Sequence, residues 1–520
     1  MMLAQSFQAL RTRLPSIEWI ISEDGIVGVV PARELRDVAA TLRAWDWRLG
    51  TIVASESGGL LTLRYCFYST RHPGWLQAVT PIDPVERTLP SITPVAIAAD
   101  WFEREIEDLF SVRFAQHPRL GDFVLHDNQW AENVGLMRST VQANDEIAEE
   151  RRVWRPRRVL EEEGAFVMPV GPIYSGEAES ALFLLETVGE DVVRAVPRLF
   201  YKYRAIEKLA EGCKAEDVLL LAERTAGTSA IGNGLAYCRA VERAIGVEPP
   251  RRAHWLRGFC AELERIRHHA TSVREICAST SLTVAASQAL WIEERLLRVA
   301  GELCGHRYLF GVLAIGGLRG DLDDRDVRSA AATVRSLYGK IAAMRAALEN
   351  TSSFLDRIER VGIVDERAVR EFELVGPFAR AGGVAADMRV VQPYEPYPNV
   401  AFDVPIEREG DGYARLRVLF GEIEQSLRIL ETLAQNLPSG PVRAEPQMRR
   451  GAALGWTEAP RGASIQWVEL DERGAVVRYR TTPPSFRNWH GFHVATEGFA
   501  FQDFPIVLAT LDLSVAENDR

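Results

Sequence analysis

The sequence predicts an α+β protein, in which a small N-terminal α/β domain is joined to a larger, mainly helical domain with a C-terminal β-hairpin region. Three observations support this fold class. Short β-rich runs and helical segments alternate up to about residue 125, long amphipathic segments follow from about residue 166, and strand-like alternation returns after Pro438. With 520 residues, the chain is also too long for one hydrophobic core.

The composition narrows the class of protein. Apolar residues make up 47% of the chain, which is enough for substantial cores, and the formal net charge is −11 with acids and bases interspersed. Because phosphate binding needs a concentrated basic surface, no nucleic acid is expected as a partner. The one basic cluster, residues 151–158, precedes three glutamates, so we interpret it as a solvated linker, with a docking patch as the alternative.

Six cysteines are scattered along the chain without a CxxC pair. The first residues lack the long apolar core of a signal peptide, so we expect these thiols to be reduced, buried and cytoplasmic. No stretch approaches the ~18 apolar residues of a membrane-spanning helix. The sequence therefore predicts contact with a membrane only through partner proteins.

The small domain is assigned to residues 1–125, and its strands are predicted first. Residues 17–21 and 25–30 are β-rich, and residues 60–68 and 75–80 alternate in the manner of half-buried strands. Between them, residues 31–47 have apolar side chains at helical spacing. Asp100 is expected to cap a further helix, whose apolar side comprises Trp101, Phe102, Ile106 and Leu109.

A polar, weakly periodic stretch at residues 126–165 is predicted to be a linker, and residues 166–520 form the larger domain. Four long amphipathic segments of this domain are enough for a helix bundle. They span residues 214–246, 251–279, 284–309 and 324–350. After Pro438, residues 464–470 and 475–480 flank an Asp-Glu-Arg-Gly turn and are predicted to pair as a hairpin.

One motif in the small domain is specific because of its length and its His-Pro ending. It reads Trp101-Phe-Glu-Arg-Glu-Ile-Glu-Asp-Leu-Phe-Ser-Val-Arg-Phe-Ala-Gln-His117-Pro118. It resembles the signature of the small hydrophilic subunit of respiratory complex I. The same pattern occurs in formate hydrogenlyase large subunits, where the small and large parts are fused. Ser111 departs from the usual glycine of the family, and His117-Pro118 is interpreted as a structural turn.

The larger domain resembles the hydrogenase-like large subunit of complex I and of group-4 membrane-bound nickel–iron hydrogenases. Five segments carry the resemblance: Gly171-Pro-Ile-Tyr174, Phe200-Tyr-Lys-Tyr-Arg-Ala-Ile-Glu-Lys-Leu209, Ala261-Glu-Leu-Glu-Arg-Ile-Arg-His-His-Ala270, Ile315-Gly-Gly-Leu-Arg319 and Gly455-Trp-Thr-Glu-Ala-Pro-Arg-Gly462. The resemblance covers most of the chain and implies the hydrogenase large-subunit fold for residues 166–520.

The hydrogenases of this family hold nickel and iron with two CxxC pairs. An alignment without gaps places Ala226, Ser229, Ser514 and Glu517 on these four positions. Nickel in this role needs soft thiolate donors, whereas alanine cannot ligate and a serine hydroxyl is a poor ligand at neutral pH. The resemblance therefore implies a hydrogenase-type frame that binds no metal of its own. The final residues instead resemble the Asp-Arg ending of complex I subunits.

Quinone binding in complex I uses a loop histidine and a tyrosine as hydrogen-bond donors. Those positions fall here on Ala178 for the histidine and on Leu221 or Gly227 for the tyrosine, so both donors are missing. Tyr174 can replace one of them from a shifted position, which leaves quinone as a possible acceptor. The alternative is a loop tyrosine packed at a subunit interface.

Arg204 and His269 match positions that lie, in complex I, near the terminal iron–sulfur cluster of the neighbouring small subunit. The resemblance assigns them to that cluster, because cations nearby stabilise its reduced form. The alternatives are an ion-paired arginine and a histidine in a helical core. His268 is expected on the surface, since adjacent residues of a helix point in different directions.

Glu207 and Glu223 match helices that line the family's central cavity. They are candidates for proton relay, because burial would raise their pKa values. The alternative for Glu223 is an ion pair with Arg224 or another arginine. Glu458 and Arg461 are expected to fix a loop through an ion pair with each other, with catalysis as the alternative.

The resemblance implies a peripheral subunit at the cytoplasmic face of a membrane-bound, complex-I-like oxidoreductase of the NADH:quinone or hydrogenase-like kind, coupled to proton or other ion translocation. Its expected partners are an iron–sulfur small subunit and membrane-embedded ion-pumping subunits. The expected cofactors are the cluster in that partner and quinone, with none bound by the chain itself. A redox-inactive scaffold and a hydrogenase with unorthodox ligands are the two alternatives.

Overall fold

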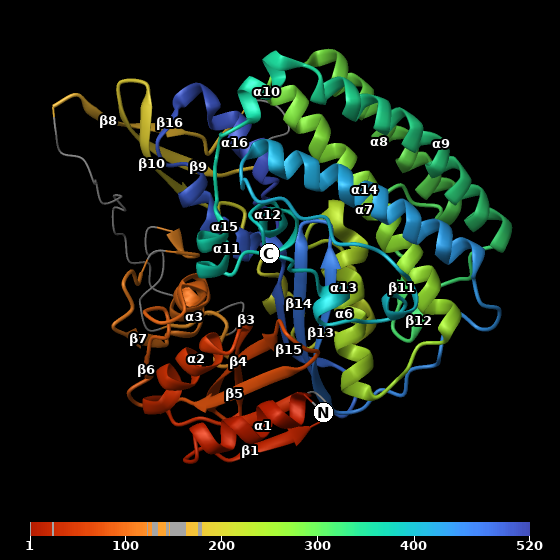
Figure 1. The fold of residues 1–520 in the computed structure, drawn as a ribbon. Helices are drawn as coiled ribbons and strands as arrows, with labels where there is room; N and C mark the ends of the chain where they lie inside the picture. Colours follow the sequence, from red (N-terminus) through yellow and green to blue (C-terminus); the bar gives the residue numbers. More distant parts are fainter. Residues whose placement is uncertain are drawn as a thin grey trace.

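The computed structural model describes residues 2–22, 25–121, 123–126, 134–141, 145, 163–174 and 179–520. Figure 1 shows an N-terminal sheet domain, a helical bundle on the opposite side of the molecule, and a small central sheet between them. This arrangement confirms the α+β fold class. Most of the expected linker, residues 126–165, lies outside the described residues.

The N-terminal domain contains a five-stranded sheet with helices packed on it. Its strands follow the order β1 (Trp19–Ser22), β2 (Gly25–Val29), β5 (Trp75–Pro81), β4 (Leu60–Ser69) and β3 (Trp47–Ser57). β2 and β5 are parallel and the other neighbouring pairs are antiparallel. The helices are α1 (Met2–Arg13), α2 (Leu35–Ala44) and α3 (Asp100–Phe110), and a short parallel pair joins β6 (Thr88–Pro90) to β7 (Arg113–Ala115). The four strands expected from the sequence are confirmed, whereas β3 was not predicted.

Asp100 does not cap α3. It is the first helical residue, Ala99 is the N-cap, and no side chain donates or accepts a capping bond there. The expectation was wrong because a 3₁₀ turn, Ile97–Ala99, leads directly into the helix. At the other end, Ser111 adopts a left-handed conformation with φ of 54°, which is the backbone region that glycine tolerates best.

A second sheet precedes the helices of the larger domain. It is antiparallel and has the order β16 (Phe499–Ala500), β10 (Asp191–Arg198), β9 (Leu182–Val188) and β8 (Ala165–Val170). The short strand from the end of the chain thus pairs with a segment about three hundred positions earlier. This pairing places the short strand beside the turn between β9 and β10.

Four helices form the bundle, and three of them were predicted. α7 (Arg251–Ser279) packs against α8 (Thr283–Cys304) and α14 (Gly412–Gln435), and α9 (Asp324–Glu349) packs against both α8 and α14. The expected fourth member was wrong. Residues 214–246 form two helices, α5 (Ala215–Glu223) and α6 (Ala230–Ile245), and α6 lies against the central sheet instead of joining the bundle.

Close backbone contact explains the position of α6. The central sheet consists of β13 (Gly451–Ala459), β14 (Gly462–Leu470) and β15 (Val476–Thr482), which confirms the predicted hairpin and adds a third strand. A Cβ at Gly455 would lie 2.1 Å from the carbonyl oxygen of Ala236 in α6. Glycine is therefore required where this helix crosses β13, and the residue without a side chain lets the backbones approach.

Shorter elements connect these layers. They are α4 (Ile206–Leu209), β11 (Leu313–Ala314), β12 (Gly317–Leu318), α10 (Ser352–Ile358), α11 (Glu366–Glu371), α12 (Gly376–Ala381), α13 (Met388–Val391), α15 (Pro484–Ala495) and α16 (Phe504–Leu511). Within the described parts of the chain, no helix has both the length and the apolar character that crossing a membrane requires.

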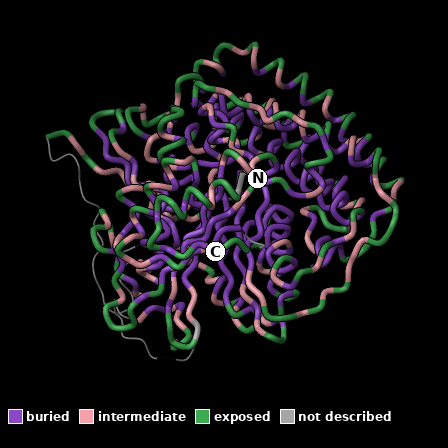
Figure 2. Tube along the Cα trace, turned by 60° about the horizontal axis from the view of Figure 1, so that its bottom comes forward, coloured by how far each residue is buried: buried purple, intermediate pink, exposed green. Residues whose placement is uncertain are grey.

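The end of the chain lies inside the protein. Figure 2 marks the C-terminus among buried segments, and Glu517, Asn518, Asp519 and Arg520 are each at most 2% exposed. The interior also includes four of the six cysteines, whereas Cys213 and Cys304 are partly exposed. The two domains share one continuous interior, because Trp75 of the first domain contacts Trp456 of the central sheet, with ring centroids 5.1 Å apart.

Substituting Gly455→Ala tests the close crossing of α6 and β13. The added methyl has no space, so we expect the free energy of unfolding to fall by about 1–3 kcal/mol, measured by denaturant unfolding. The control is Gly339→Ala in α9, where a Cβ meets nothing within 4 Å. That change should stabilise the protein by about 0.5–1 kcal/mol, and equal effects of the two variants would contradict the packing described here.

Candidate functional site

The two segments that the resemblance assigns to metal binding lie side by side. Arg204 connects them, because its guanidinium donates to the carbonyl oxygens of Arg224 and Thr225, each at 2.8 Å. The same group donates to the carbonyl oxygens of Ala516 at 2.6 Å and Asp519 at 3.0 Å. The C-terminal tail is thereby fixed against the loop between α5 and α6.

The side chains at the four ligand positions do not suit nickel and iron. Ala226 offers a methyl group, and the buried Ser229 hydroxyl has no hydrogen-bond partner in the described structure. The Ser514 hydroxyl donates to Glu179, and Glu517 accepts a hydrogen bond from the backbone N–H of Ser485 at 2.9 Å. None of these donors is a thiolate, so the donor set does not fit a nickel–iron centre.

The described residues offer no substitute ligand set. Among them, no group of three or more histidine, cysteine, aspartate or glutamate side chains is arranged to hold a metal ion. Cys238 lies inside α6, and burial raises the pKa of its thiol well above the usual value. A protonated, buried thiol of this kind is a poor metal ligand.

A positive charge lies between the two segments. Arg461 donates to the backbone and side chain of Asp512 at 2.7 and 3.2 Å and to the Thr228 hydroxyl at 3.3 Å. Its guanidinium is also 3.6 Å from Glu517. Arg461 therefore pairs with the tail and not with Glu458, which corrects the expected ion pair. A fixed cation at this place disfavours a divalent metal by electrostatic repulsion.

His268 joins the same group, and the expectation of a surface position was wrong. It is 2% exposed, and its Nε2 lies 2.7 Å from Asp512, which also accepts from Ser272 at 2.9 Å. The reason is that α7 is enclosed on several sides by α8, α14 and α16. Burial lowers the pKa of His268 to about 3, although Asp512 opposes this shift.

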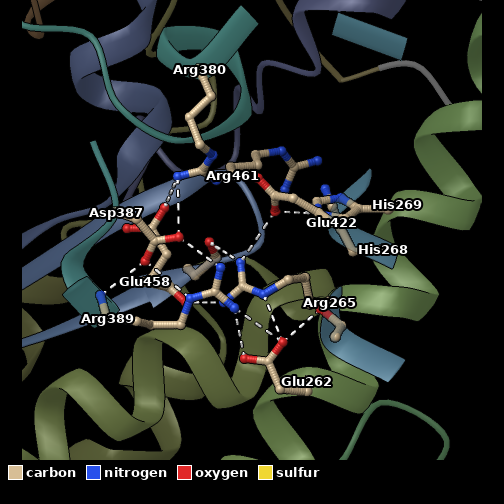
Figure 3. Close-up of polar contacts among 12 residues, drawn as sticks. Glu262, Arg265, His268, His269, Arg380, Asp387, Arg389, Glu422, Glu458 and Arg461 are labelled. Carbon is tan, nitrogen blue, oxygen red and sulfur yellow. Dashed lines mark hydrogen bonds and ion pairs between the residues drawn. The ribbon is translucent and has the colours of Figure 1, made fainter. Parts of the chain in front are cut away.

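A larger set of buried charges adjoins this pair, and we call it the charged cluster. It comprises Glu262, Arg265, His269, Arg380, Asp387, Arg389, Glu422 and Glu458, each at most 3% exposed. These residues come from α7, α12, α14, β13 and α13 with the residue that precedes it (Figure 3). Buried charges require partners, and the cluster supplies them internally.

The contacts within the charged cluster form a continuous chain. His269 lies 2.9 Å from Glu422, which contacts Arg380, and Arg380 donates to Glu458 at 2.9 Å. Arg389 is bidentate to Asp387, at 3.0 and 2.7 Å.

Glu262 completes the cluster at its other side. Arg389 donates to it at 3.0 Å and Arg265 at 3.2 Å, while Tyr397 and Ser426 each donate at 2.6 Å. With two arginines and two hydroxyl donors, this carboxylate is fully satisfied. Burial alone would raise the pKa of Glu262, but the arginines hold it below the usual value.

The structure places the predicted residues in different environments. Arg204 is exposed apart from its bonds to the loop and the tail, whereas His269 is completely buried in the charged cluster. Glu207 accepts from Arg478 at 2.7 Å and from Arg480 at 3.2 Å. Burial alone would raise the pKa of Glu207, but these arginines and Arg520 outweigh it and lower the pKa to about 2, so the expected rise was wrong.

Glu223 and Tyr174 are engaged by nearby backbone groups. Burial raises the pKa of Glu223 as expected, although Gly311 donates its N–H to both carboxylate oxygens at 3.2 Å and Arg224 lies 3.8 Å away. The Tyr174 hydroxyl lies 2.8 Å from the carbonyl oxygen of Ala181 and 3.1 Å from that of Val170, so it closes the β8–β9 connection. Ala178 lies outside the described residues.

Sequence reasoning missed most of the charged cluster. Glu422 belongs to α14, a helix that was not predicted, and it shares a buried face with Leu419 and Ser426. Arg380 likewise stands between alanines in α12. The available signal was a charged residue within an apolar face, which indicates a buried ion pair when the helix itself is recognised.

Comparisons with known proteins identify families and relatives that share this architecture. The family described as respiratory-chain NADH dehydrogenase, 49 Kd subunit, matches residues 282–450 and 443–520, and the 30 Kd subunit family matches residues 29–145. Formate hydrogenlyase subunit 5 of Escherichia coli (strain K12) is 28% identical over 86% of this chain and 79% of its own length. The C/D protein of the NADH-quinone oxidoreductase of Acinetobacter baumannii (strain AYE) is 25% identical, covering 92% and 88%.

One solved structure supports the same relation. A chain of the membrane-bound sulfane sulfur reductase, described as an archaeal respiratory membrane complex, has a TM-score of 0.65 and 27% identity to this protein. The match covers 69% of this chain and 100% of that chain. Over 69% of its length, the present chain therefore shares the fold of a chain from a respiratory membrane complex.

Replacing Arg204 tests how the tail is held. Because four carbonyl oxygens lose a side-chain donor in Arg204→Ala, we expect faster amide hydrogen exchange in residues 512–520 and 224–229, measured by mass spectrometry. The accompanying loss of stability should be roughly 1–3 kcal/mol. Arg33→Ala, at a side chain that is 84% exposed, is the control and should leave both segments unchanged. Unchanged exchange in Arg204→Ala would contradict this role.

Proposed function

This chain belongs to the 30 Kd and 49 Kd subunit families of respiratory-chain NADH dehydrogenase, joined in one polypeptide, and we propose that it is a peripheral-arm subunit of a membrane-bound, complex-I-like electron-transfer assembly. The proposed assembly is coupled to ion translocation, and the chain has no nickel–iron centre of its own. The relatives named as NADH-quinone oxidoreductase and formate hydrogenlyase subunits support this class.

The proposal depends on one observation: the two segments of the metal site still meet, but side chains other than thiolates occupy the ligand positions. The loop before α6 and the C-terminal tail still meet, but they are joined by the guanidinium groups of Arg204 and Arg461. A frame that retains this junction without thiolates supports assembly and electron-acceptor binding more readily than hydrogen chemistry.

The proposed partners are an iron–sulfur small subunit and membrane-embedded ion-pumping subunits. Two exposed cations support the first of these. Arg204 and Arg224 lie at the same edge of the site, and the Arg224 side chain is 54% exposed and rests over the Phe310 ring at 4.8 Å. A positively charged edge of this kind favours the reduced form of a neighbouring cluster. The assembly would place the chain at the cytoplasmic face of the membrane.

A quinone is the proposed acceptor class, although the donors differ from those of complex I. The Tyr174 hydroxyl is bonded inside its own loop, and Leu221 and Gly227 offer no donor side chain. The remaining candidates at the junction are the Ser229 hydroxyl and the Arg461 guanidinium, which can donate to an oxygen-bearing acceptor.

A redox-inactive scaffold is the second candidate. The observation in its favour is that the metal-ligating cysteines and the quinone donors of the family are replaced together. The folded domain, the buried tail and the exposed edge would then serve assembly alone. Iron in an accompanying small subunit distinguishes the two candidates.

Metal and subunit analysis of the intact assembly tests the proposed function. The chain is to be purified from detergent-solubilised membranes through an affinity tag, and its metals measured by mass spectrometry. We expect iron, a small cysteine-rich partner and proteins with many spanning helices, with nickel far below one atom per chain. Stoichiometric nickel contradicts the proposal, and a complex without iron favours the scaffold.

Charge reversal at the exposed edge tests where the iron–sulfur partner binds. In Arg224→Glu we expect loss of the small partner, or a lower midpoint potential of its cluster, because an anion replaces a cation beside it. Arg328→Glu in α9 is the matched control, since its side chain is also 54% exposed. Equal behaviour of both variants in co-purification and redox titration would place the partner elsewhere.

A further inference from the structure

A cavity of about 190 Å³ lies between the N-terminal domain and the larger domain. Arg48, Tyr68 and Thr70 line it from the first domain, and Asp387, Met388 and Glu458 line it from the second. Asp387 and Glu458 are members of the charged cluster and are each only 2% exposed. The cavity therefore meets the otherwise enclosed cluster at these two carboxylates.

The charges in the cluster do not balance. Its four carboxylates, Glu262, Asp387, Glu422 and Glu458, face three guanidinium groups, those of Arg265, Arg380 and Arg389. With His269 neutral, the fully ionised cluster carries one excess negative charge. Excess charge in a buried site is costly, and one bound proton removes it.

The surroundings of the carboxylates indicate where that proton binds. Asp387 faces two nitrogens of Arg389, and Glu422 faces both Arg380 and His269. Glu458 has the least cationic support: Arg380 reaches one oxygen at 2.9 Å, and the other accepts only from the Met388 N–H at 2.9 Å.

Neighbouring elements contribute further charged and polar groups, and among them Arg380 and Arg265 lower the pKa of Glu458 without outweighing burial and Asp387. Arg265 of α7 faces the backbone carbonyl of Glu458, not its carboxylate, and Arg380 also lies 3.5 Å from Asp387. The Tyr394 hydroxyl accepts from the Glu458 N–H, with Arg239 beyond the Tyr394 ring. Arg48 and Arg370 also line the cavity; Arg48 acts on the Glu373 carboxylate, and Arg370 pairs with Glu366 at 2.7 Å.

We propose that Glu458 binds one proton reversibly and exchanges it with solvent through the cavity between the two domains. The charged cluster thereby stores a proton beside the candidate site. The pKa values of the carboxylates in the cluster agree with this geometry. Burial and the charge of Asp387 raise the pKa of Glu458 to about 7, whereas the arginines hold the pKa values of Asp387 and Glu422 below their usual range against the effect of burial.

A series of contacts connects Glu458, which binds the proton, to the C-terminal tail. Arg380 bridges Glu458 and Glu422, Glu422 bonds to His269, and the His269 and His268 rings have centroids 6.0 Å apart. A change of charge at Glu458 alters the field along this line up to Asp512. The inference goes beyond the proposed electron-transfer function, because it does not depend on any acceptor or metal in a partner.

The pH dependence of stability has a definite sign. A carboxylic acid whose pKa rises from 4.5 when unfolded to about 7 when folded stabilises the protein most below pH 4.5. That contribution decreases between these two values, because the unfolded chain loses its proton first. Glu458→Gln should abolish this part of the decrease.

Infrared difference spectroscopy of the full-length chain tests the proposal directly. We expect a carbonyl band from a buried carboxylic acid that disappears with a midpoint near pH 7 and shifts rapidly in deuterium oxide. Burial also raises the pKa values of Glu103 and Glu264 to about 7, so Glu458→Gln should remove one component of the band, whereas Glu366→Gln, which changes an exposed carboxylate, should remove none.

Two further variants separate proton binding from loss of folding. Asp387→Asn retains Glu458 but removes the neighbouring negative charge, so the midpoint should shift to lower pH. Ala385→Trp fills the exposed mouth of the cavity, so the band should remain while its deuterium exchange slows several-fold. Identical spectra of the wild-type protein and Glu458→Gln across this pH range, or a Glu458 component that neither Asp387→Asn nor Ala385→Trp affects, would overturn the proposal.

Discussion

Burying a carboxylate without a counter-charge destabilises a fold by more than a single packing contact stabilises it, and this protein buries many carboxylates. Arginine pairs meet that requirement at several junctions between segments. Glu105 of α3 lies 2.7 Å from Arg480 and 2.8 Å from Arg520, and Glu207 shares the same two arginines. The N-terminal domain, the central sheet and the end of the chain are therefore fixed by one set of charges.

Arginine contacts also replace the metal as the link between the two segments of the candidate site. A nickel–iron centre needs thiolates from two segments, and the metal itself then joins them. In this chain the segments are joined by Arg204 and Arg461, which bind carbonyl oxygens, a hydroxyl and carboxylates. The junction is thus maintained by hydrogen bonds, and the fold retains the meeting of loop and tail after the metal chemistry is gone.

The charged cluster differs from these junctions because its charges do not cancel. Arg389 and Arg265 satisfy Glu262, but Glu458 shares Arg380 with two other carboxylates. A buried carboxylate in this position takes up a proton more readily than it ionises. Because Glu458 also lines the cavity between the domains, its proton can exchange with solvent. The excess negative charge of the cluster therefore makes Glu458 a site that can respond to pH.

The sequence by itself determined the helices at residues 251–279 and 324–350, the hairpin after Pro438 and the absence of thiolates at the ligand positions. Periodicity and residue type are local properties, which explains this success. Only the tertiary structure decided that α14 completes the bundle, that His268 is buried and that Glu458 pairs with Arg380 and not with Arg461. These outcomes depend on which distant segments meet: Arg389 reaches Glu262 across 127 positions and His269 reaches Glu422 across 153, and no local pattern records such contacts.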